Sequence, residues 1–527
     1  MKIEILDTTL RDGTQGAGVS FSPEDRINVI RALDALGISY IEAGMVTDDA
    51  GREFFDSLRD VRTESAKLCV FSPTAHPGVA AEKSDLLAGA AAAPVPCAVL
   101  YGKSSLYQVR EVLRTTPEEN LRMIRDSIRF LRSAGKEVLF DAEHFFDGYG
   151  DGPDYVLSVV DAALEAGASR VILCDTNGGM LPDVIGMTVE RVARSFPDIG
   201  IHCHNDMGMA VSGSVSAVLA GARQVQGTVS GIGERCGNAN LNTLIPLLQL
   251  KLGFDCVGDR LRTLTPTVKY INEIANLTFD ETEPFVGAYA FTHKAGTHID
   301  GVKKDPRTFE HVDPESVGNL RNTVISELSG RAAVMDKIAD LTGRKYDSAG
   351  KEDPRILEAI QALREKEKNG YVYEQAEGSL ALMIDRVMGE DVSHFDLLEF
   401  KVIAEDSKRA EEDGEVMKSS AMIKISVDGS DEIAAAEGNG PVNAMDRALR
   451  RALTRFYPEV SKMKLTDYRV RVIDSGATAS SVRVLIESTD GVSVWRTVGV
   501  STDIINASWQ ALRDSVEYML SHVSQKS

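Results

Sequence analysis

Short apolar segments of β type alternate with amphipathic helical stretches from residue 2 to about residue 250, and the pair occurs eight times. Strands separated by helices in this way pair in parallel, because each crossover needs a helix to bring the chain back to the same edge. The expected strands span residues 3–10, 40–43, 67–71, 97–101, 138–144, 170–175, 200–204 and 224–231. The alternation predicts an α/β fold in which residues 1–255 form a (β/α)8 TIM barrel.

The rest of the chain divides into two further parts. Residues 256–394 are rich in helical segments and loops, and we expect a helical linker region there. Residues 395–527 contain an internal repeat, because two blocks each consist of three β-type segments followed by a helical segment. The two helical segments share one spacing of residues: Asn443-Ala444 with Ala448-Leu449, and Asn506-Ala507 with Ala511-Leu512. This repeat predicts a C-terminal α+β domain of duplicated βββα units with a groove between its halves.

Charge and cysteine usage restrict the partners and the compartment. The 58 basic and 79 acidic residues give a formal net charge of -21, which repels nucleic acid and anionic membranes. The six cysteines include no CxxC pair, a pattern typical of a reducing compartment. The N-terminus has no long apolar segment, so the sequence predicts a cytoplasmic protein without a membrane span.

The segment HCHND at residues 202–206 is the clearest sign of chemistry. His202 and His204 are two residues apart on an expected strand, so their imidazoles face the same side and can converge on one metal ion. Asp12, after the first strand, is the natural anionic third ligand, and Asn238 could add a carbonyl oxygen. Such mixed nitrogen and oxygen ligation suits Zn, Mn or Mg. The alternative is a pair of hydrogen-bonded core histidines.

A glycine-rich loop follows the last expected strand. Phosphate-type groups often bind after the late strands of such a barrel. Glycines at these positions are also explained by a tight turn alone. The loop residues of interest are Gly231, Gly233, Glu234, Arg235 and Gly237.

Four motifs in one order carry a family resemblance over nearly the whole chain: DTTLRDGTQ, HCHND, GIGERCGNAN and GTHIDG. Together they resemble the 2-isopropylmalate, homocitrate and citramalate synthases, which are metal-dependent acyltransferases on a TIM barrel. DAEHFFDGY, LCDTNGG, ISELSGR and EGNGPVNA are similar to the citramalate branch. The resemblance implies Claisen condensation of acetyl-CoA with a 2-oxo acid, namely pyruvate giving (R)-citramalate and CoA in isoleucine biosynthesis.

The resemblance also implies roles for individual residues. It implies a divalent metal held by Asp12, His202, His204 and Asn238, and CoA at the glycine-rich loop. Arg11 would stabilise the developing alkoxide, Thr176 would bind the substrate carboxylate, and Glu42 would hold Arg11 in the substrate site. Glu143 and His298 resemble the pair that removes a methyl proton from acetyl-CoA, with His298 supplied by the same or a neighbouring subunit.

The C-terminal repeat resembles the regulatory domain of the same synthases. It implies a homodimer and an amino-acid effector, leucine or isoleucine, bound between the halves. The alternative is a module that only dimerises the chain. The residues expected at the effector site are Gly438, Asn439, Gly440, Ala477 and Thr478.

Two segments depart from the citramalate branch at places where specificity would be decided. They are Met45–Thr47 after the second strand and Ser105–Gln108 after the fourth. They leave open a 2-isopropylmalate or homocitrate synthase activity on another 2-oxo acid. The sequence is also compatible with an acyl-CoA lyase on the same barrel and with a catalytically silent amino-acid sensor.

Overall fold

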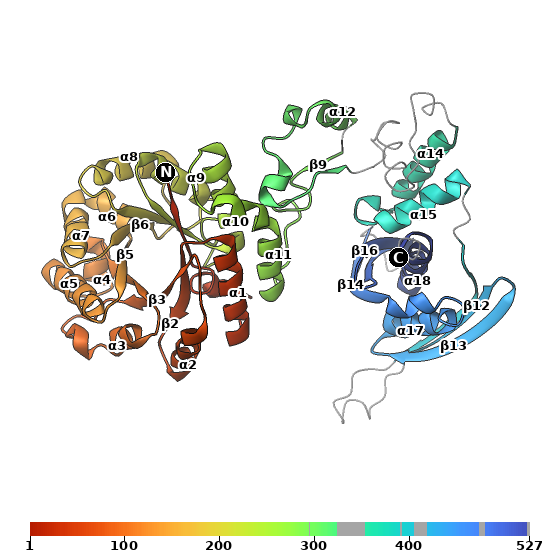
Figure 1. Cartoon of the computed structure of the whole chain (residues 1–527), viewed down its shortest axis with the longest axis horizontal. Coiled ribbons are helices and arrows are strands. Elements are labelled where there is room, and N and C mark those ends of the chain that lie inside the picture. Colours follow the sequence, from red (N-terminus) through yellow and green to blue (C-terminus); the bar gives the residue numbers. More distant parts are fainter. Residues whose placement is uncertain (295, 324–353, 390–392, 405–418, 474–479, 524–527) are drawn as a thin grey trace. The chain divides into compact units, whose positions relative to one another are not determined.

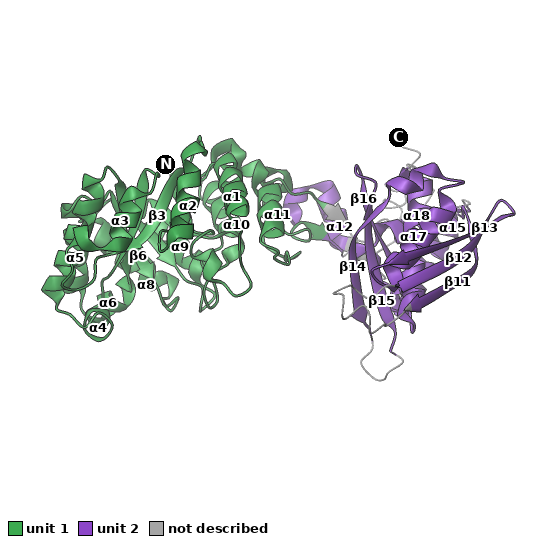
Figure 2. Cartoon of the chain, turned by 90° about the horizontal axis from the view of Figure 1, so that it is seen from below, with its two compact units in different colours: residues 1–292, 310–322 green, residues 293–309, 323–527 purple. Residues whose placement is uncertain are grey.

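The computed structural model describes residues 1–294, 296–323, 354–389, 393–404, 419–473 and 480–523 (Figure 1). The chain forms two compact units (Figure 2). The first contains Met1–Thr292 and Glu310–Asn322, and the second contains His293–Phe309 and Thr323–Ser527. The expected barrel region lies within the first unit, whereas the expected linker region, residues 256–394, is divided between the two.

Eight parallel strands close into a barrel in chain order, which confirms the predicted fold class. The closure is made by β1, which pairs with both β2 and β8. The strands are β1 (Glu4–Asp7), β2 (Tyr40–Met45), β3 (Lys67–Pro73), β4 (Cys97–Lys103), β5 (Glu137–Glu143), β6 (Arg170–Asp175), β7 (Ile199–Cys203) and β8 (Gln224–Gly227).

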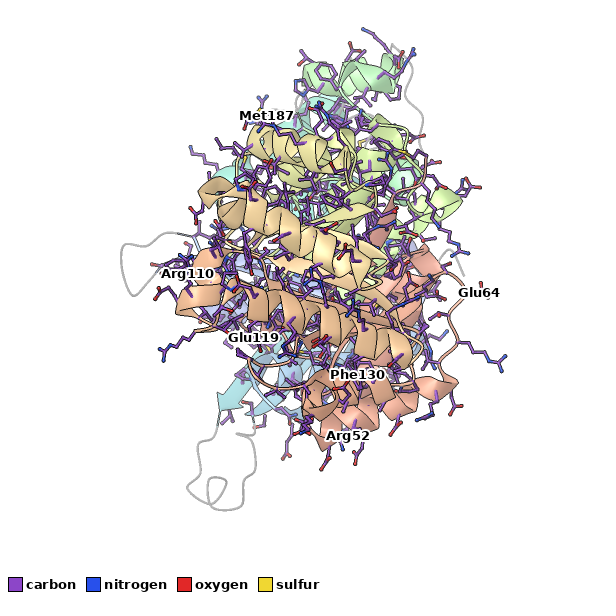
Figure 3. The ribbon with its side chains drawn as sticks, turned by 90° about the vertical axis from the view of Figure 1, so that its left-hand side faces the viewer. Arg52, Glu64, Arg110, Glu119, Phe130 and Met187 are labelled. Atoms are coloured by element: carbon purple, nitrogen blue, oxygen red, sulfur yellow. The ribbon has the colours of Figure 1, made fainter. Side chains whose placement is uncertain are left out.

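The helices around the barrel begin where the sequence places their capping residues. Ser22 caps α1 (Pro23–Leu36) in a capping box with Asp25, and Thr116 caps α5 (Pro117–Ser133). The other helices are α2 (Asp49–Ser57), α3 (Asp85–Ala92), α4 (Leu106–Glu111), α6 (Phe145–Asp151), α7 (Pro153–Glu165), α8 (Pro182–Ala193), α9 (Ala210–Ala220), α10 (Leu241–Pro246) and α11 (Leu264–Ile274). Their polar faces point to solvent, as Arg52 on α2 and Arg110 on α4 do in Figure 3.

Each barrel strand buries both faces, because the outer face packs against helices and the inner face fills the barrel. Outward side chains such as Val70 and Val225 belong to the large core shared with the helices. A smaller inner core includes Leu6, Phe71 and Leu139. Polar side chains at the carboxyl ends of the strands complete the inside of the barrel, and the candidate site lies there.

Two strands end three or more residues before the predicted position, while β2, β3 and β4 each continue two residues beyond it. β1 ends at Asp7 rather than residue 10, and β8 ends at Gly227 rather than residue 231. After β8 the chain turns through a 3-10 segment, Val229–Gly231, in which Ser230 has a φ of 56°. A strand cannot continue through a left-handed residue, so the pairing stops before the glycine-rich loop.

The second unit contains the predicted duplication, which is confirmed. The first half is β11 (Asp396–Ala404), β12 (Ser419–Val427), β13 (Ser430–Gly438) and α17 (Pro441–Leu453); the second is β14 (Lys464–Val472), β15 (Val482–Thr489), β16 (Val494–Ser501) and α18 (Ile504–Tyr518). Burial alternates along β12, as expected for a strand with one covered face. One apolar core joins the halves and includes Ile423, Leu449, Ile486 and Leu512.

Helices outside the duplication complete the second unit. α14 (Pro354–Lys368) and α15 (Glu377–Met388) form a core with Val498 of β16. α12 (Gly296–Lys304) carries the GTHIDG motif. Among the described residues, no helix combines the length and the apolar character that a membrane crossing needs.

Candidate active site

A cavity of about 230 Å³ opens at the carboxyl ends of the barrel strands. This is the face on which the loops and strand ends of a TIM barrel assemble their chemistry. Its lining residues are Arg11, Asp12, Gln15, Met45, Phe71, Tyr101, Asp141, Glu143, Cys174, Thr176, His202, His204, Glu234 and Arg235. The cavity therefore brings together the expected residues from the first, fifth, sixth and seventh strands.

Asp12, His202 and His204 form a buried triad whose possible ligand atoms all lie within 4.8 Å of one another. Oδ2 of Asp12 lies 3.8 Å from Nε2 of His202 and 4.0 Å from Nε2 of His204. These separations fit a single ion placed about 2 Å from each atom. Cys203, between the two histidines, joins the outer core, as the alternation of a strand requires.

Each histidine uses its other ring nitrogen for a hydrogen bond within the protein. Nδ1 of His202 lies 2.9 Å from Oε1 of Gln226, and Nδ1 of His204 lies 3.3 Å from the carbonyl oxygen of Gly237. Both acceptors are oxygens, so Nδ1 carries the proton in each neutral ring and Nε2 keeps its lone pair. This is the state that a histidine needs in order to bind a metal ion.

Asn238 supplies a fourth candidate ligand. Its Nδ2 donates to Oδ1 of Asp12 at 3.1 Å and to the carbonyl oxygen of Ile232 at 3.1 Å. Its Oδ1 is buried and has no hydrogen-bond partner among the described residues. A buried amide oxygen is rarely left unpaired, and here it lies beside the triad. The donor set of two imidazoles, one carboxylate and one amide oxygen therefore fits a divalent cation.

The glycine-rich loop gives Asn238 its position. Gly233 has a φ of 152° and lies against the amide of Asn238, so a side chain at that position would displace the amide. Gly237 has a φ of 84° and packs on the backbone of Gly231. A tight turn thus explains these glycines. Arg235 pairs with both carboxylate oxygens of Asp206, at 2.8 and 2.9 Å, while Glu234 lines the cavity.

Arg11 is held on three sides. Its Nε donates to Oε2 of Glu42 at 2.7 Å, and its Nη1 donates to Oδ2 of Asp12 at 3.0 Å. Its guanidinium carbon lies 3.8 Å from the centre of the Phe71 ring, which stacks in turn on Tyr101. Glu42 is fully buried and does not line the cavity, and its carboxylate contacts Arg11.

Burial and neighbouring charges set the protonation states of the site. Burial opposes ionisation of Asp12, but Arg11 and the two histidines outweigh it and lower the pKa of Asp12 to about 2. Burial, followed by the neighbouring His204, lowers the pKa of His202 to about 3, so its imidazole is neutral at pH 7. Burial, followed by Glu42, raises the pKa of Asp141 to about 8.

Glu143 and Thr176 face the cavity with defined partners. Oε2 of Glu143 lies 2.6 Å from Nζ of Lys103. Oγ1 of Thr176 accepts the backbone N–H of His144 at 2.8 Å, which leaves the hydroxyl proton of Thr176 able to donate to a ligand.

The two segments that depart from the citramalate branch, Met45–Thr47 and Ser105–Gln108, contribute residues to different cavities. Met45 lines the site cavity. Ser105, Tyr107 and Gln108 line a neighbouring cavity of about 510 Å³ that also includes His144. The first segment therefore has a residue in the site itself, and the second lies beside it.

Sequence reasoning missed three residues that line the cavity, Asp141, Phe71 and Tyr101, and two that contact lining residues from outside it, Gln226 and Lys103. Asp141 lies two residues before Glu143 on the same strand, so the period of two places it on the same inner face. Gln226 faces inward from β8 in the same way. No motif includes Phe71. Tyr101 and Lys103 lie just before the departing segment Ser105–Gln108, but no role was predicted for either residue.

The expected residues outside the barrel lie in the second unit. His298, on α12, is exposed and stacks on Phe309 at a centroid distance of 4.2 Å. Gly438 ends β13, and Asn439 N–H donates to Oδ1 of Asn443 at 3.3 Å. Gly440 precedes α17. Ala477 and Thr478 lie outside the described residues, as does the ISELSGR motif at residues 325–331.

Family models cover three parts of the chain. Residues 2–264 match the model described as HMGL-like, and residues 285–368 match the homocitrate synthase post-HMGL domain-like model. Residues 374–520 match the LeuA allosteric (dimerisation) domain. The fold and the site thus define an HMGL-like barrel that is followed by an allosteric and dimerisation domain of the LeuA type.

Relatives over the whole chain narrow this class. The chain is 45% identical over 524 residues to the (R)-citramalate synthase of Aquifex aeolicus, with 98% of each chain covered. It is 43% identical to that of Geobacter sulfurreducens, with 99% of this chain and 98% of the relative covered. A probable 2-isopropylmalate synthase of Methanopyrus kandleri is 32% identical, with 97% of each chain covered. The chain belongs to the (R)-citramalate synthase family.

Proposed function

We propose that this protein is a metal-dependent acyltransferase of the cytoplasm that condenses acetyl-CoA with pyruvate to give (R)-citramalate and CoA. The observation that carries the proposal is the convergence of Arg11, Asp12, His202 and His204 on one small cavity at the barrel mouth. The near full-length similarity to two (R)-citramalate synthases supports the choice of reaction.

The metal site would be formed by Asp12, His202, His204 and Asn238. A divalent cation bound there supplies a Lewis acid that polarises the carbonyl of a 2-oxo acid. The protonation states of these side chains suit metal binding, because Asp12 is ionised and both Nε2 atoms keep their lone pairs. Mn, Mg and Zn all fit this ligand set.

Arg11 is placed to stabilise charge that develops during the reaction. Attack of a nucleophilic carbon on the keto group moves an electron pair onto the carbonyl oxygen, which becomes an alkoxide. A guanidinium fixed in advance by Glu42 and Phe71 meets this charge without reorganising, and that is the main source of electrostatic catalysis. Thr176 is placed to donate a hydrogen bond to the substrate carboxylate.

Glu143 is the proposed base in the barrel. It would accept a proton from the methyl carbon of acetyl-CoA, whose electrons then form the new carbon–carbon bond to the keto carbon of pyruvate. The alkoxide takes up a proton to become the hydroxyl group of the product, and water then cleaves the thioester and releases CoA and the second carboxylate. Nζ of Lys103 forms an ion pair with the Glu143 carboxylate at 2.6 Å and would hold it at the edge of the cavity. His298 is the proposed partner in proton transfer, supplied by α12 of the same or a second subunit.

Apolar side chains line the cavity beside Arg11 and would contact the substrate. The cavity has a volume of about 230 Å³, and Met45, Phe71 and Tyr101 form apolar walls near Arg11. The methyl group of pyruvate would pack against these apolar side chains, and the near full-length similarity to (R)-citramalate synthases supports this acid. We therefore propose pyruvate rather than the larger acids that the 2-isopropylmalate and homocitrate branches imply.

The test is release of free thiol from acetyl-CoA in the presence of Mg, Mn or Zn. The 2-oxo acids are pyruvate, 2-oxobutyrate, 2-oxoisovalerate, 2-oxoglutarate and glyoxylate, with the product identified by chiral chromatography. We expect release with pyruvate and (R)-citramalate as the product, and loss of both in His202→Ala. Release with only a larger acid would replace pyruvate as the substrate, and no release would favour a lyase or a sensor.

We further propose regulation by an amino acid and assembly as a homodimer through the second unit. The LeuA-type domain supports both roles. The proposed effector is isoleucine or leucine, with Gly438–Gly440 among its contacts. Inhibition curves for the two amino acids, measured beside the mass of the assembly by light scattering, test the proposal. A monomeric enzyme that neither amino acid inhibits would contradict it.

The glycine-rich loop at Gly231–Gly237 remains the proposed contact for CoA.

A further inference from the structure

We propose that Gln226 and Asp141 are positioning residues that select the tautomer of His202 and thereby set the strength of the metal site. The inference rests on the metal site of the proposed function. It concerns two residues for which the motifs predicted no role, and it follows from a chain of side-chain hydrogen bonds inside the barrel.

The chain runs from the wall of the cavity to the metal triad. Nε2 of Gln226 donates to Oδ1 of Asp141 at 2.9 Å, and Oε1 of Gln226 accepts from Nδ1 of His202 at 2.9 Å. Gln226 is fully buried, and Asp141 and His202 are each 5% exposed. These side chains come from β8, β5 and β7, so the closed barrel brings three strands into one network.

The direction of each hydrogen bond follows from the chemistry of the groups. A carboxamide donates only through nitrogen and accepts only through oxygen. When Oδ1 of Asp141 takes the amide nitrogen, the amide oxygen must face His202. A neutral imidazole beside that oxygen places its proton on Nδ1, and the lone pair on Nε2 then faces Asp12. Rotation of the amide by a half turn would reverse this order and put the proton on Nε2, where no metal can bind.

The second histidine is held in a different way. Nδ1 of His204 faces the backbone carbonyl of Gly237, which is an acceptor in every conformation of the side chains. The tautomer of His204 therefore does not depend on any other side chain. Of the two histidines, only His202 has a tautomer that can change when a single residue that is not a metal ligand is substituted.

Gln224 provides a matched control on the same strand. It is also fully buried and faces into the barrel, but neither of its amide atoms has a hydrogen-bond partner among the described residues. Gln224→Leu and Gln226→Leu remove the same group from the same strand interior. Only Gln226→Leu breaks the chain to His202.

The test reads the tautomer directly in metal-free protein. The full chain is labelled with 15N-histidine, treated with EDTA, and its ring nitrogens are observed by long-range 15N–1H correlation; the His202 signals are assigned by their loss in His202→Ala. We expect the Nδ1–H form in the wild type and in Gln224→Leu. In Gln226→Leu we expect a mixture or the Nε2–H form. An unchanged Nδ1–H signal in Gln226→Leu would overturn the proposal.

Metal affinity supplies the second measurement. Competition with a chelator for Co²⁺ should show a loss of about 10- to 100-fold in Gln226→Leu, the range found when an outer-shell partner of a ligand is removed. Gln224→Leu should bind Co²⁺ as the wild type does. Equal affinity in the two variants would contradict the inference. Neither measurement uses a substrate, so both results can be interpreted even if the proposed reaction is wrong.

A conservative variant covers the case in which Gln226→Leu does not fold, as judged by circular dichroism. In Gln226→Glu the carboxylate still accepts from Nδ1, so we expect the wild-type tautomer to persist. Asp141→Asn replaces the carboxyl group that accepts from the Gln226 amide with a second amide and keeps the size of the side chain. We expect it to release part of the His202 population to the Nε2–H form, and an unmixed Nδ1–H signal there would remove Asp141 from the proposal.

Discussion

Replacing Glu42 with glutamine tests how much the buried pair beneath the active site contributes to the barrel. The side chain of Glu42 is 0% exposed and that of Arg11 is 10% exposed, with 2.7 Å between Oε2 and Nε. Removing one partner from a buried ion pair costs about 3–5 kcal/mol, because the other charge is left desolvated. Asp12 still contacts Arg11 at 3.0 Å, which places the expected cost at the lower end, about 3 kcal/mol.

That free energy converts to a shift in melting temperature. The unit has roughly 300 residues. Its unfolding entropy is therefore on the order of 0.6 kcal/mol per kelvin, and a loss of about 3 kcal/mol lowers Tm by about 5 °C. Both tryptophans, Trp495 and Trp509, lie in the other unit, so tryptophan fluorescence does not report on the barrel. Differential scanning calorimetry in EDTA is the suitable assay, since a bound metal would stabilise the native state.

The matched control is Glu190→Gln on the surface. Glu190 pairs with Arg194 at 2.8 Å, nearly the distance of the buried pair, but both side chains are well exposed. An exposed pair contributes little, so the expected shift is under about 1 °C. If the two variants lower Tm by the same amount, burial does not give the Glu42 pair its importance and the reasoning is refuted.

Three further results follow from the same structure. His202→Ala should abolish both metal content and turnover, whereas His298→Ala should abolish turnover and leave metal bound; metal analysis beside thiol release measures both, and retained turnover would remove the assigned role. Burial raises the pKa of Asp7 to about 7 from an ordinary 3.8, so the folded state holds a proton that the unfolded state has lost between these values. The Tm of the barrel should therefore fall as the pH rises from 5 to 7 and fall less in Asp7→Asn; parallel curves would contradict this. Thr176→Val should raise KM for pyruvate several-fold with a smaller effect on kcat, and an unchanged KM would exclude Thr176 from carboxylate binding.

The sequence by itself determined the features that depend on local period and local chemistry. Alternating strands and helices lead to a parallel barrel, and Ser22 and Thr116 mark the starts of two helices because a hydroxyl there can cap free backbone N–H groups. The spacing of His202 and His204 places both rings on one side of β7. Asp12 joins them because the carboxyl ends of all eight strands share one face.

Tertiary structure decided everything that depends on which side chains meet across the barrel. Asp141 and Gln226 are far apart in sequence, and only the closure of the sheet makes them partners. The same holds for the stacking of Arg11 on Phe71, and for the pairing of Lys103 with Glu143. A strand pattern states which face a residue takes but not which neighbour it finds there. Hydrogen-bond direction and the tautomer of His202 arise from those neighbours, so they become visible only in the folded chain.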